Sequence, residues 1–229
     1  IVIGCARNGA IIDDMNREYK GHSFGVVDVS HFNAVKLWID GVITKYGVPD
    51  MLINNAAINP GGSSSVDDCT KVMNVNLFGS LNMIYCLLPR MKQCSKDIKI
   101  LNVSSLCGLM AIPKRLPYCM SKFALEGLTQ SMALELPNNI IMCSYDPGIV
   151  ATDMFTRNNN VSVSDAIKIG CVSVDDWGKL NYPFIVNGLN RNDHNGKHVF
   201  GVKVKESMYN YSQRIKPFIN AYDAFQSKL

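Results

Sequence analysis

The sequence has no pair of cysteines in C-x-x-C spacing, although its 229 residues include eight cysteines. Neighbouring cysteines are at least eight residues apart, which gives little support to a zinc site or a thioredoxin-type site. Most of them lie inside apolar runs, where a free thiol behaves as a small hydrophobic side chain. We therefore expect no bound metal and a reducing compartment, most simply the cytoplasm.

Long apolar runs and long runs of like charge are also missing. The longest apolar stretches, such as residues 84–88 and 140–142, are far shorter than the roughly 20 residues that cross a bilayer, so no membrane span is expected. Lys and Arg outnumber Asp and Glu by 23 to 19, a net charge of +4, without the basic stripe typical of nucleic-acid binders. No charged leader precedes the first strand-like run, and the first residue is Ile1. We therefore expect either that the start of the chain was removed or that the sequence begins inside a larger chain.

What the sequence does contain is enough apolar material for one large core. Hydrophobic residues make up 47% of the chain and charged residues 18%. These proportions favour a single globular domain, which we place at residues 1–202, followed by a tail at 203–229.

Short β-rich runs alternate with longer runs of helical period. The expected strands are 1–5, 23–28, 50–54, 98–103, 140–145 and 198–202. The expected helices between them are 11–20, 31–46, 66–91, 117–136 and 175–189. This order, with nearly continuous apolar strands, predicts an α/β fold with a doubly wound parallel sheet. Ligands of such sheets bind beyond the carboxyl ends of the strands.

Two segments depart from the alternation. Residues 153–174 are polar and weakly periodic, which is typical of either a mobile loop or lid or a solvated connector. The tail 203–229 carries aromatic and apolar residues at helical spacing, and we expect it to be a docking or subunit-contact helix rather than a catalytic element.

The strongest chemical signal is Tyr118 followed four residues later by Lys122, with Ser105 thirteen residues upstream of the tyrosine. Four-residue spacing places Tyr118 and Lys122 on one helical face. A nearby ammonium favours the phenolate and so lowers the pKa of a tyrosine. A serine hydroxyl beside the tyrosine can hold a carbonyl oxygen while that oxygen is protonated.

Other motifs occur in order along the chain. They are N-N-A-A at 54–57, N-V-N-L-F-G at 74–79, N-V-S-S at 102–105, P-Y-C-M-S-K at 117–122 and D-P-G-I-V-A-T at 146–152. With these motifs the sequence resembles the short-chain dehydrogenase/reductase family of single-domain type over residues 1–202. The fold implied is Rossmann-like.

The resemblance implies catalytic roles for four residues. Tyr118 would be the general acid in carbonyl reduction, and Ser105, rather than its neighbour Ser104, would polarise the substrate oxygen. Lys122 would lower the pKa of Tyr118 and bind the nicotinamide ribose. Asn76 would hold a water that passes protons from Lys122 to solvent. The alternative for Asn76 is a structural amide in a helix kink.

The resemblance also implies a nicotinamide dinucleotide as cofactor. It places Asp28 and Val29 at the adenine, and Asn55, Ala56 and Ala57 along the adenosine. Pro147, Gly148, Val150 and Thr152 would lie around the nicotinamide. The alternatives are that Asp28 begins a helix and that Pro147 and Gly148 form only a turn.

Arg7 bears on the choice between the two dinucleotides. It follows the first strand, where an acidic residue would bind the ribose 2′-hydroxyl of NAD. A guanidinium there suits the 2′-phosphate of NADP instead. NADP(H) is therefore the expected cofactor, and a solvated loop residue is the alternative for Arg7.

One part of the family pattern is absent. The family's first strand and its T-G-x-x-x-G-x-G turn, which brings the pyrophosphate to a helix N-terminus, have no counterpart in this sequence. Ile1 then falls on the second strand of the family, and on the order of 30 residues of one strand and one helix are lacking. A central strand would lose its neighbour. We expect that the N-terminus of the given sequence is incomplete, and a truncated, non-catalytic relative that acts through protein contacts is the competing interpretation.

Apolar residues between Ser105 and Tyr118 suggest a small, mostly apolar or aromatic carbonyl or alcohol as substrate; they are Leu106, Cys107, Met110, Ala111, Ile112 and Leu116. A partial resemblance to plant-type NADPH-dependent pterin aldehyde reductases makes a pterin aldehyde one candidate, and a broad carbonyl or steroid reductase is another. By resemblance, helices 66–91 and 117–136 would pair copies of the chain into a homodimer or homotetramer.

Overall fold

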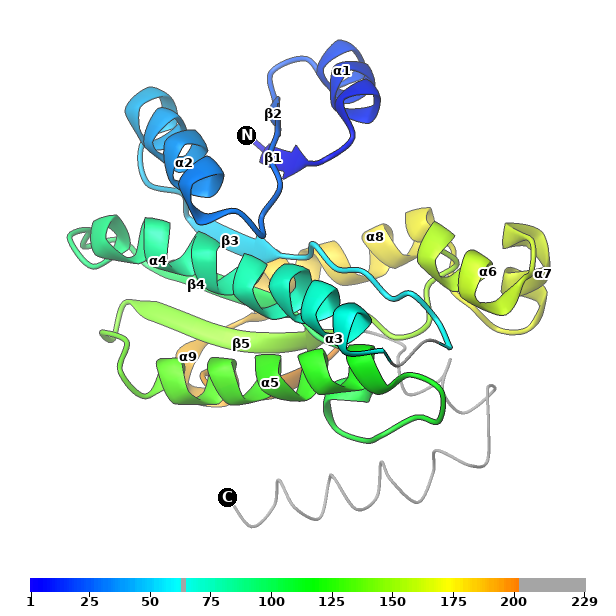
Figure 1. Cartoon of the computed structure of the whole chain (residues 1–229). Helices are drawn as coiled ribbons and strands as arrows, with labels where there is room; N and C mark the ends of the chain where they lie inside the picture. The colour runs from blue at the N-terminus through cyan, green and yellow to red at the C-terminus, as the bar shows by residue number, and fades with distance from the viewer. Residues whose placement is uncertain (63–64, 202–229) are drawn as a thin grey trace.

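The computed structural model describes residues 1–62 and 65–201, and strands alternate with helices along the chain (Figure 1). The strands are β1 (Ile3–Ala6), β2 (Ser23–Val26), β3 (Met51–Asn54), β4 (Ile98–Val103), β5 (Ile140–Asp146) and β6 (His198–Phe200). The longer helices are α1 (Gly9–Glu18), α2 (Phe32–Tyr46), α3 (Val66–Met73), α4 (Gly79–Met91), α5 (Leu116–Ala133) and α8 (Val174–Pro183). Shorter ones are α6 (Asp153–Asn159), α7 (Val163–Lys168) and α9 (Arg191–His194). The predicted elements are confirmed, with boundaries displaced by up to a few residues.

All the strand pairs are parallel, as predicted, but they form two separate sheets. β1 pairs with β2, while the order β3-β4-β5-β6 makes a second sheet of four strands. Within residues 1–62 and 65–201 no strand joins β1 to β3, and Figure 1 shows the two sheets apart. This division lies where the resemblance implied that a central strand lacks its neighbour.

The core lies on both faces of the four-stranded sheet because successive side chains of β5 point to opposite faces. Ile140 and Met142 face a large cluster that includes Ile39, Ile84 and Ile100. The residues between and after them face a second cluster on the opposite side; they are Ile141, Cys143 and Tyr145. Every residue of β5 is buried. This two-residue period with two buried faces is what a doubly wound sheet requires.

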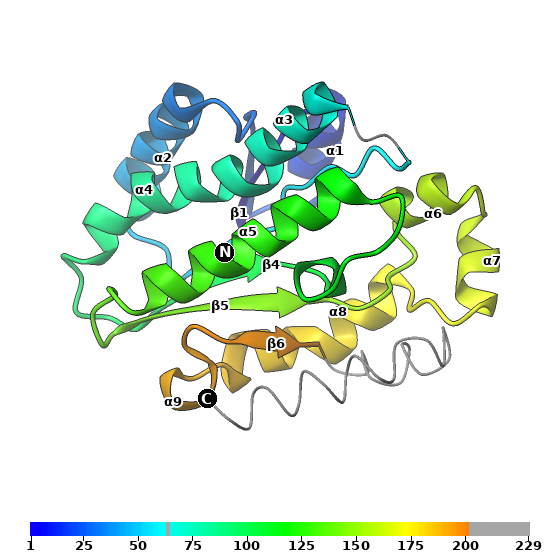
Figure 2. The same ribbon diagram turned by 60° about the horizontal axis from the view of Figure 1, so that its bottom comes forward.

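Helices cover the two faces unequally. Helices α2, α4 and α5 lie on one side of the four-stranded sheet, and α8 and α9 lie on the other (Figure 2). The strands β5 and β6 point toward α6 and α7 (Figure 2). Residues that follow the strands are therefore gathered near this end of the molecule.

The expected helix 66–91 is a single run with a change of pitch. A π-helical turn (Asn74–Phe78) joins α3 to α4. The run is long and apolar enough, by length and composition only, to cross a membrane, which the short apolar runs had not indicated. Half of its most apolar window is buried against the rest of the protein, and the core helix of a compact domain passes the same test.

Residues 153–174 are not the loop that their weak periodicity suggested. They form α6 and α7, and each helix begins with a hydroxyl cap. Thr152 Oγ1 accepts a hydrogen bond from Phe155 N (3.4 Å), and Ser162 Oγ accepts one from Asp165 N (3.1 Å). Capping groups of this kind stabilise short helices that have no strong apolar stripe. The predicted tail 203–229 and the last residue of the predicted strand 198–202 lie outside the described residues.

Two helical glycines test how closely the helices pack. A Cβ on Gly79, at the start of α4, would lie 2.6 Å from Val29 Cγ2, whereas one on Gly127 in α5 would meet no atom within 4 Å. We expect Gly79→Ala to lower the free energy of unfolding, because overpacking costs about 1–3 kcal/mol and exceeds the helix-propensity gain. Gly127→Ala should raise it by up to about 1 kcal/mol. Urea denaturation of both variants checks this prediction. Changes in the free energy of unfolding that have the same sign in both variants would contradict it.

Candidate active site

Several candidate residues each follow a strand of one of the two parallel sheets. Arg7 follows β1, Asp28 follows β2, Asn55 follows β3 and Ser105 follows β4. The segment 147–152 follows β5 in the same way. The carboxyl ends of parallel strands lie at one edge of a sheet, which is where ligands of such folds bind.

Ser105, Tyr118 and Lys122 form one cluster at the end of β4. Lys122 Nζ lies 5.5 Å from the centre of the Tyr118 ring, a cation–π distance, and donates a hydrogen bond to Val103 O (2.7 Å). Ser105 is hydrogen-bonded to the Tyr118 hydroxyl through its side chain. The predicted arrangement of a serine, a tyrosine and a lysine in contact is therefore present.

The electrostatics of this cluster differ from the expectation. Burial raises the pKa of Tyr118, and the hydrogen bond from Ser105 opposes this rise without cancelling it. The prediction that Lys122 lowers the pKa of Tyr118 stays a prediction, because the net rise has burial as its largest cause. Burial also lowers the pKa of Lys122 to about 8, although Glu126 and Asp146 act in the opposite direction. Desolvation thus penalises the charged forms of both groups, the phenolate of Tyr118 and the ammonium of Lys122.

Asn76 lies in the π-helical turn between α3 and α4 and is buried. Its Oδ1 accepts a hydrogen bond from Ile58 N (2.7 Å), and its Nδ2 donates to Ile58 O (3.0 Å) and Ser121 Oγ (3.0 Å). Ser121 precedes Lys122, so Asn76 ties the segment after β3 to the catalytic helix. The structural role that we weighed as the alternative is thus present. The expected role in proton transfer stays a prediction.

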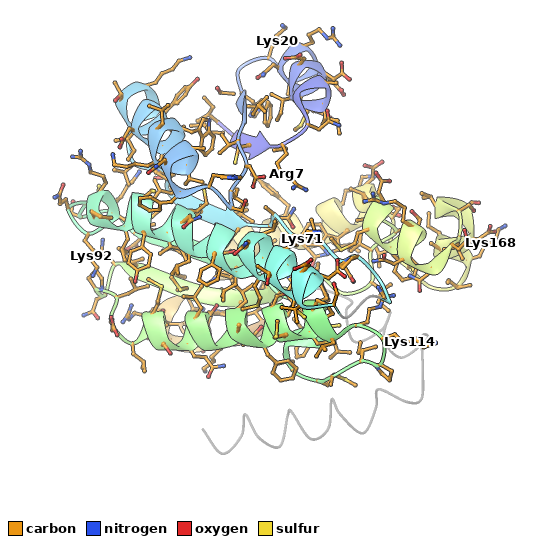
Figure 3. The ribbon with its side chains drawn as sticks, viewed as in Figure 1. Arg7, Lys20, Lys71, Lys92, Lys114 and Lys168 are labelled. Carbon is orange, nitrogen blue, oxygen red and sulfur yellow. The ribbon has the colours of Figure 1, made fainter. Side chains whose placement is uncertain are left out.

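Arg7 and Asp28 lie at the ends of β1 and β2. Arg7 Nη1 is 3.7 Å from Asp28 Oδ2, and 57% of the Arg7 side chain is exposed (Figure 3). Such exposed pairs contribute little to stability, so Arg7 remains available to an anion. Burial acts to raise the pKa of Asp28, but hydrogen bonds from Ser30 and the charge of Arg7 lower it overall.

Asp28 does not begin a helix, which was its alternative role. The N-cap position of α2 is occupied by His31, without a side-chain capping bond, whereas Asp28 Oδ1 accepts hydrogen bonds from Ser30 N (2.9 Å) and Ser30 Oγ (2.7 Å). The side chain of Val29 is buried in the core, and Val29 O accepts a hydrogen bond from Asn82 Nδ2 (2.9 Å). Val29 can therefore reach a ligand only through its main chain.

The segments after β3 and β5 present main-chain groups. Asn55 and Ala56 are exposed and Ala57 is partly buried. Gly148 has φ +74° and donates its N–H to Asp146 Oδ1 (2.9 Å), so Pro147 and Gly148 do form a tight turn. Pro147 O accepts a hydrogen bond from Trp177 Nε1 (2.9 Å), which fixes that turn against α8. Val150 forms a parallel bridge with Val172, and Thr152 caps α6.

These residues fit the two ends of a nicotinamide dinucleotide. An exposed guanidinium and a carboxylate would face the adenosine, and a glycine turn with a nearby ammonium would face the nicotinamide. Within residues 1–62 and 65–201 no T-G-x-x-x-G-x-G turn is present to cradle the pyrophosphate. The described residues therefore fit the adenosine and nicotinamide ends of the dinucleotide, but not the pyrophosphate between them.

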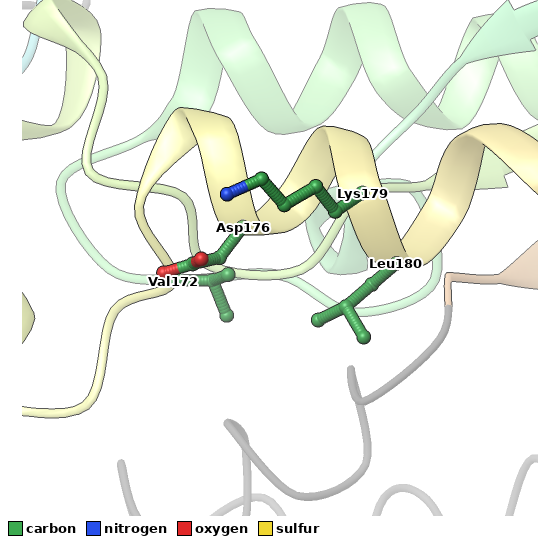
Figure 4. A pocket seen from close by; sticks show the side chains of 4 residues that line it. All are labelled: Val172, Asp176, Lys179 and Leu180. Carbon is green, nitrogen blue, oxygen red and sulfur yellow. The ribbon is translucent and has the colours of Figure 1, made fainter.

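The segment between Ser105 and Tyr118 is the one that the sequence places on the substrate side, as a prediction. Burial, with a contribution from Cys119, raises the pKa of Cys107 to about 12, so this thiol behaves as an apolar side chain. Lys114 in the same segment has φ 60°, an uncommon conformation for a residue other than glycine (Figure 3). A separate pocket beside α8 is lined by Val172, Asp176, Lys179 and Leu180 (Figure 4).

Comparison with known families matches the profile described as short chain dehydrogenase to residues 1–162. The chain belongs to the short-chain dehydrogenase family. The matched region carries Ser105, Tyr118 and Lys122 as well as the turn at Gly148.

Two curated proteins illustrate the range of this short-chain dehydrogenase's relatives. A 3-ketodihydrosphingosine reductase of Bacteroides thetaiotaomicron is 39% identical over 60% of this chain, which spans 52% of that protein. An NADPH-dependent pterin aldehyde reductase of Arabidopsis thaliana is 31% identical over 72% of each chain. The chain thus spans about half of the first protein and nearly three quarters of the second.

Solved structures of other proteins share the fold. A gluconate 5-dehydrogenase from Burkholderia cenocepacia, in complex with NADP and tartrate, superposes with a TM-score of 0.73 at 22% identity, covering 89% of this chain and 85% of that one. An aldohexose dehydrogenase of Thermoplasma acidophilum gives a TM-score of 0.72 at 21% identity, with coverage of 87% and 91%. These matches confirm the Rossmann-like fold of the short-chain dehydrogenase.

Sequence reasoning missed a set of buried polar residues behind the cluster. Glu126 lies on α5 four residues after Lys122, and its carboxylate is bonded to Ser104, Ser144 and His198. The signal for Glu126 was its position on the same helical face as Tyr118 and Lys122. His198 lies 72 residues further along the chain and gave no such signal.

Proposed function

We propose that this short-chain dehydrogenase is an NADPH-dependent reductase of aldehyde or ketone carbonyl groups. The observation that carries the proposal is the contact of Ser105, Tyr118 and Lys122 at the carboxyl end of β4. When bound, the reduced nicotinamide would supply a hydride to the carbonyl carbon. Ser105 would donate a hydrogen bond to the carbonyl oxygen, and Tyr118 would donate the proton that this oxygen needs.

The protonation states of the cluster favour the reductive direction. Burial raises the pKa of Tyr118, so its hydroxyl carries a proton at neutral pH and is ready to act as an acid. Lys122 has a pKa of about 8, so most of it is an ammonium at neutral pH. That ammonium would donate hydrogen bonds to the hydroxyls of a ribose beside Tyr118.

The substrate side favours a lipophilic or aromatic carbonyl compound over a sugar. Leu106, Met110 and Ile112 are partly buried between Ser105 and Tyr118, and Leu116 is exposed at the start of α5. Apolar surface of this kind gains free energy when it binds apolar groups. The two curated relatives are named for a ketosphingoid and for a pterin aldehyde, which agrees with such a range. A pterin aldehyde and a broader lipophilic ketone are therefore the substrates to test first.

The cofactor preference is tested by titrating the purified chain with NADPH and, separately, with NADH while following fluorescence. NADPH should bind more tightly, because Arg7 can form charge-assisted hydrogen bonds with the 2′-phosphate. Such bonds contribute about 1.5–3 kcal/mol, so Arg7→Ala should weaken NADPH binding about tenfold to a hundredfold. Binding of NADH should change much less.

Arg17→Ala is the matched control for this experiment, since Arg17 is an exposed arginine on α1 that pairs with Asp14. It should leave both affinities unchanged. Equal effects of Arg7→Ala on NADPH and NADH would refute the assignment of Arg7 to the phosphate. Failure of a folded sample to bind either cofactor would favour the competing proposal, a relative that acts through protein contacts.

We also propose that the chain acts as a homodimer or homotetramer in the cytoplasm. The outer faces of α4 and α5 carry large exposed side chains, among them Tyr85, Met120 and Phe123. Exposed apolar patches of this kind favour subunit contacts. All eight cysteines are free thiols, which suits a reducing compartment. The mass of the native protein by light scattering tests the assembly.

A further inference from the structure

Behind the catalytic cluster lies a second buried group of polar side chains. Glu126 and His198 are each more than nine-tenths buried, as are Ser104 and Ser144. Glu126 lies on α5, His198 on β6 and Ser144 on β5, while Ser104 directly follows β4. Four segments of the chain thus bring polar groups to one point in the core, which is costly unless those groups are satisfied.

The centre of this group is the carboxylate of Glu126. Ser104 Oγ donates to Glu126 Oε1, and Ser144 Oγ donates to Glu126 Oε2 (2.6 Å). His198 Nδ1 lies 2.9 Å from Glu126 Oε1, and a carboxylate only accepts, so His198 donates through Nδ1. Burial acts to raise the pKa of Glu126, but His198 and the two serines lower it overall. Three donors therefore hold Glu126 in its charged form.

Successive residues at the end of β4 connect this group to the catalytic cluster. Val103 O accepts from Lys122 Nζ, Ser104 Oγ donates to Glu126, and Ser105 is bonded to Tyr118. Tyr118, Lys122 and Glu126 are spaced by four residues on α5, so they follow one another along one face. Three consecutive residues, Val103 to Ser105, thus bind three side chains of α5 that are four residues apart.

We propose that Glu126, held in place by His198, is a positioning residue that keeps the buried ammonium of Lys122 charged. Lys122 is fully buried, and its hydrogen bond to the Val103 carbonyl provides no opposite charge. Charges within a poorly hydrated interior interact strongly even without direct contact. The charged and titratable groups that face Lys122 come from two elements and the turn after β4; they are Tyr118 and Glu126 of α5, Asp146 of β5, and Cys107 of the turn.

Asp146 does not replace Glu126 in this role. Burial raises the pKa of Asp146, so the ionised form of this carboxyl group is disfavoured. Glu126, by contrast, accepts hydrogen bonds from three donors that favour its ionised form. His198 Nε2 lies 3.9 Å from Asp146 Oδ2, so the imidazole stands between the two carboxylates. The inference rests on the proposed function only where catalysis is measured, because the charge of Lys122 can be observed without a substrate.

The test follows the ¹⁵Nζ resonance of Lys122 with pH in the full chain. The amide variant Glu126→Gln retains the size of the side chain and removes its charge. We expect the titration midpoint of Lys122 to fall by about one pH unit, the size of the effect of a nearby charge. The alkaline limb of the kcat/KM profile for carbonyl reduction should move to lower pH by the same amount.

His198→Asn provides a second route should Glu126→Gln fail to fold. It removes the imidazole donor and should shift the Lys122 midpoint in the same direction, by a smaller amount. Glu135→Gln, an exposed change just beyond α5, is the control and should leave the midpoint in place. An unchanged midpoint in a folded variant overturns the inference. A shifted midpoint in a protein that reduces no carbonyl supports the inference and rejects the proposed function.

Discussion

Replacing Tyr118 by Phe should lower kcat/KM for carbonyl reduction by about 10²–10⁴, the usual contribution of a positioned general acid. The change removes one oxygen from a partly buried ring and leaves the packing of α5 intact. The ring also remains beside Lys122, whose Nζ lies 5.5 Å from its centre. The loss should therefore appear in catalysis, with an unchanged circular dichroism spectrum and similar NADPH affinity.

Tyr182→Phe is the matched control, because Tyr182 is an exposed tyrosine on α8 that is far from the candidate cluster in sequence. It should retain full activity. If folded Tyr118→Phe protein kept more than a tenth of the activity, Tyr118 would not be the proton donor. The assignment of the cluster would then have to be abandoned.

The fold was predictable because its signals are local. Each strand of the four-stranded sheet is a short apolar run, and the helices between them have a clear apolar period, so type and order were readable. The catalytic cluster was predictable for a related reason. Tyr118 and Lys122 are four residues apart on one helix, and Ser105 directly follows a strand whose direction the fold fixes.

The helices α6 and α7 were missed because their stability comes from their ends. Their sequences lack a continuous apolar stripe, but Thr152 and Ser162 supply N-caps, and Asp153 and Asp165 lie in the first turns. Hydroxyl caps followed by acidic residues are a readable helix start. Attention to these caps, rather than to periodicity, would have replaced the predicted loop by two short helices.

The buried polar groups could not be read from the sequence because their partners are distant along the chain. Glu126 is bonded to residues 18 and 72 positions away, namely Ser144 and His198. Asn54 donates to Asn102 across 48 residues (2.8 Å). Such pairings depend on the register between strands, and the spacing of polar residues in one strand does not reveal it. The raised pKa of Tyr118 was missed for the same reason, since burial is a property of the assembled core.

Lys122→Met should alter the pH dependence of stability in the cofactor-free protein. Burial lowers the pKa of Lys122 from the ordinary 10.5 to about 8 in the folded state. Below pH 8 both the folded and the unfolded chain carry the proton, and the full cost of a buried ammonium is present. Between pH 8 and 10.5 only the unfolded chain holds the proton, so the wild-type protein gains stability relative to the variant as the pH rises. The total gain is up to about 3 kcal/mol.

The measurement is the difference in free energy of unfolding between the two proteins, from urea denaturation at several pH values. Other groups titrate in both proteins and cancel in this difference, which should be flat below pH 7 and rise by pH 10. Lys92→Met, a change at an exposed lysine after α4, should give a much flatter difference. A flat curve for Lys122→Met would show that the ammonium is not desolvated. A rise would mean that the protein gives up stability at neutral pH to keep a charge beside Tyr118, as expected of a group retained for catalysis.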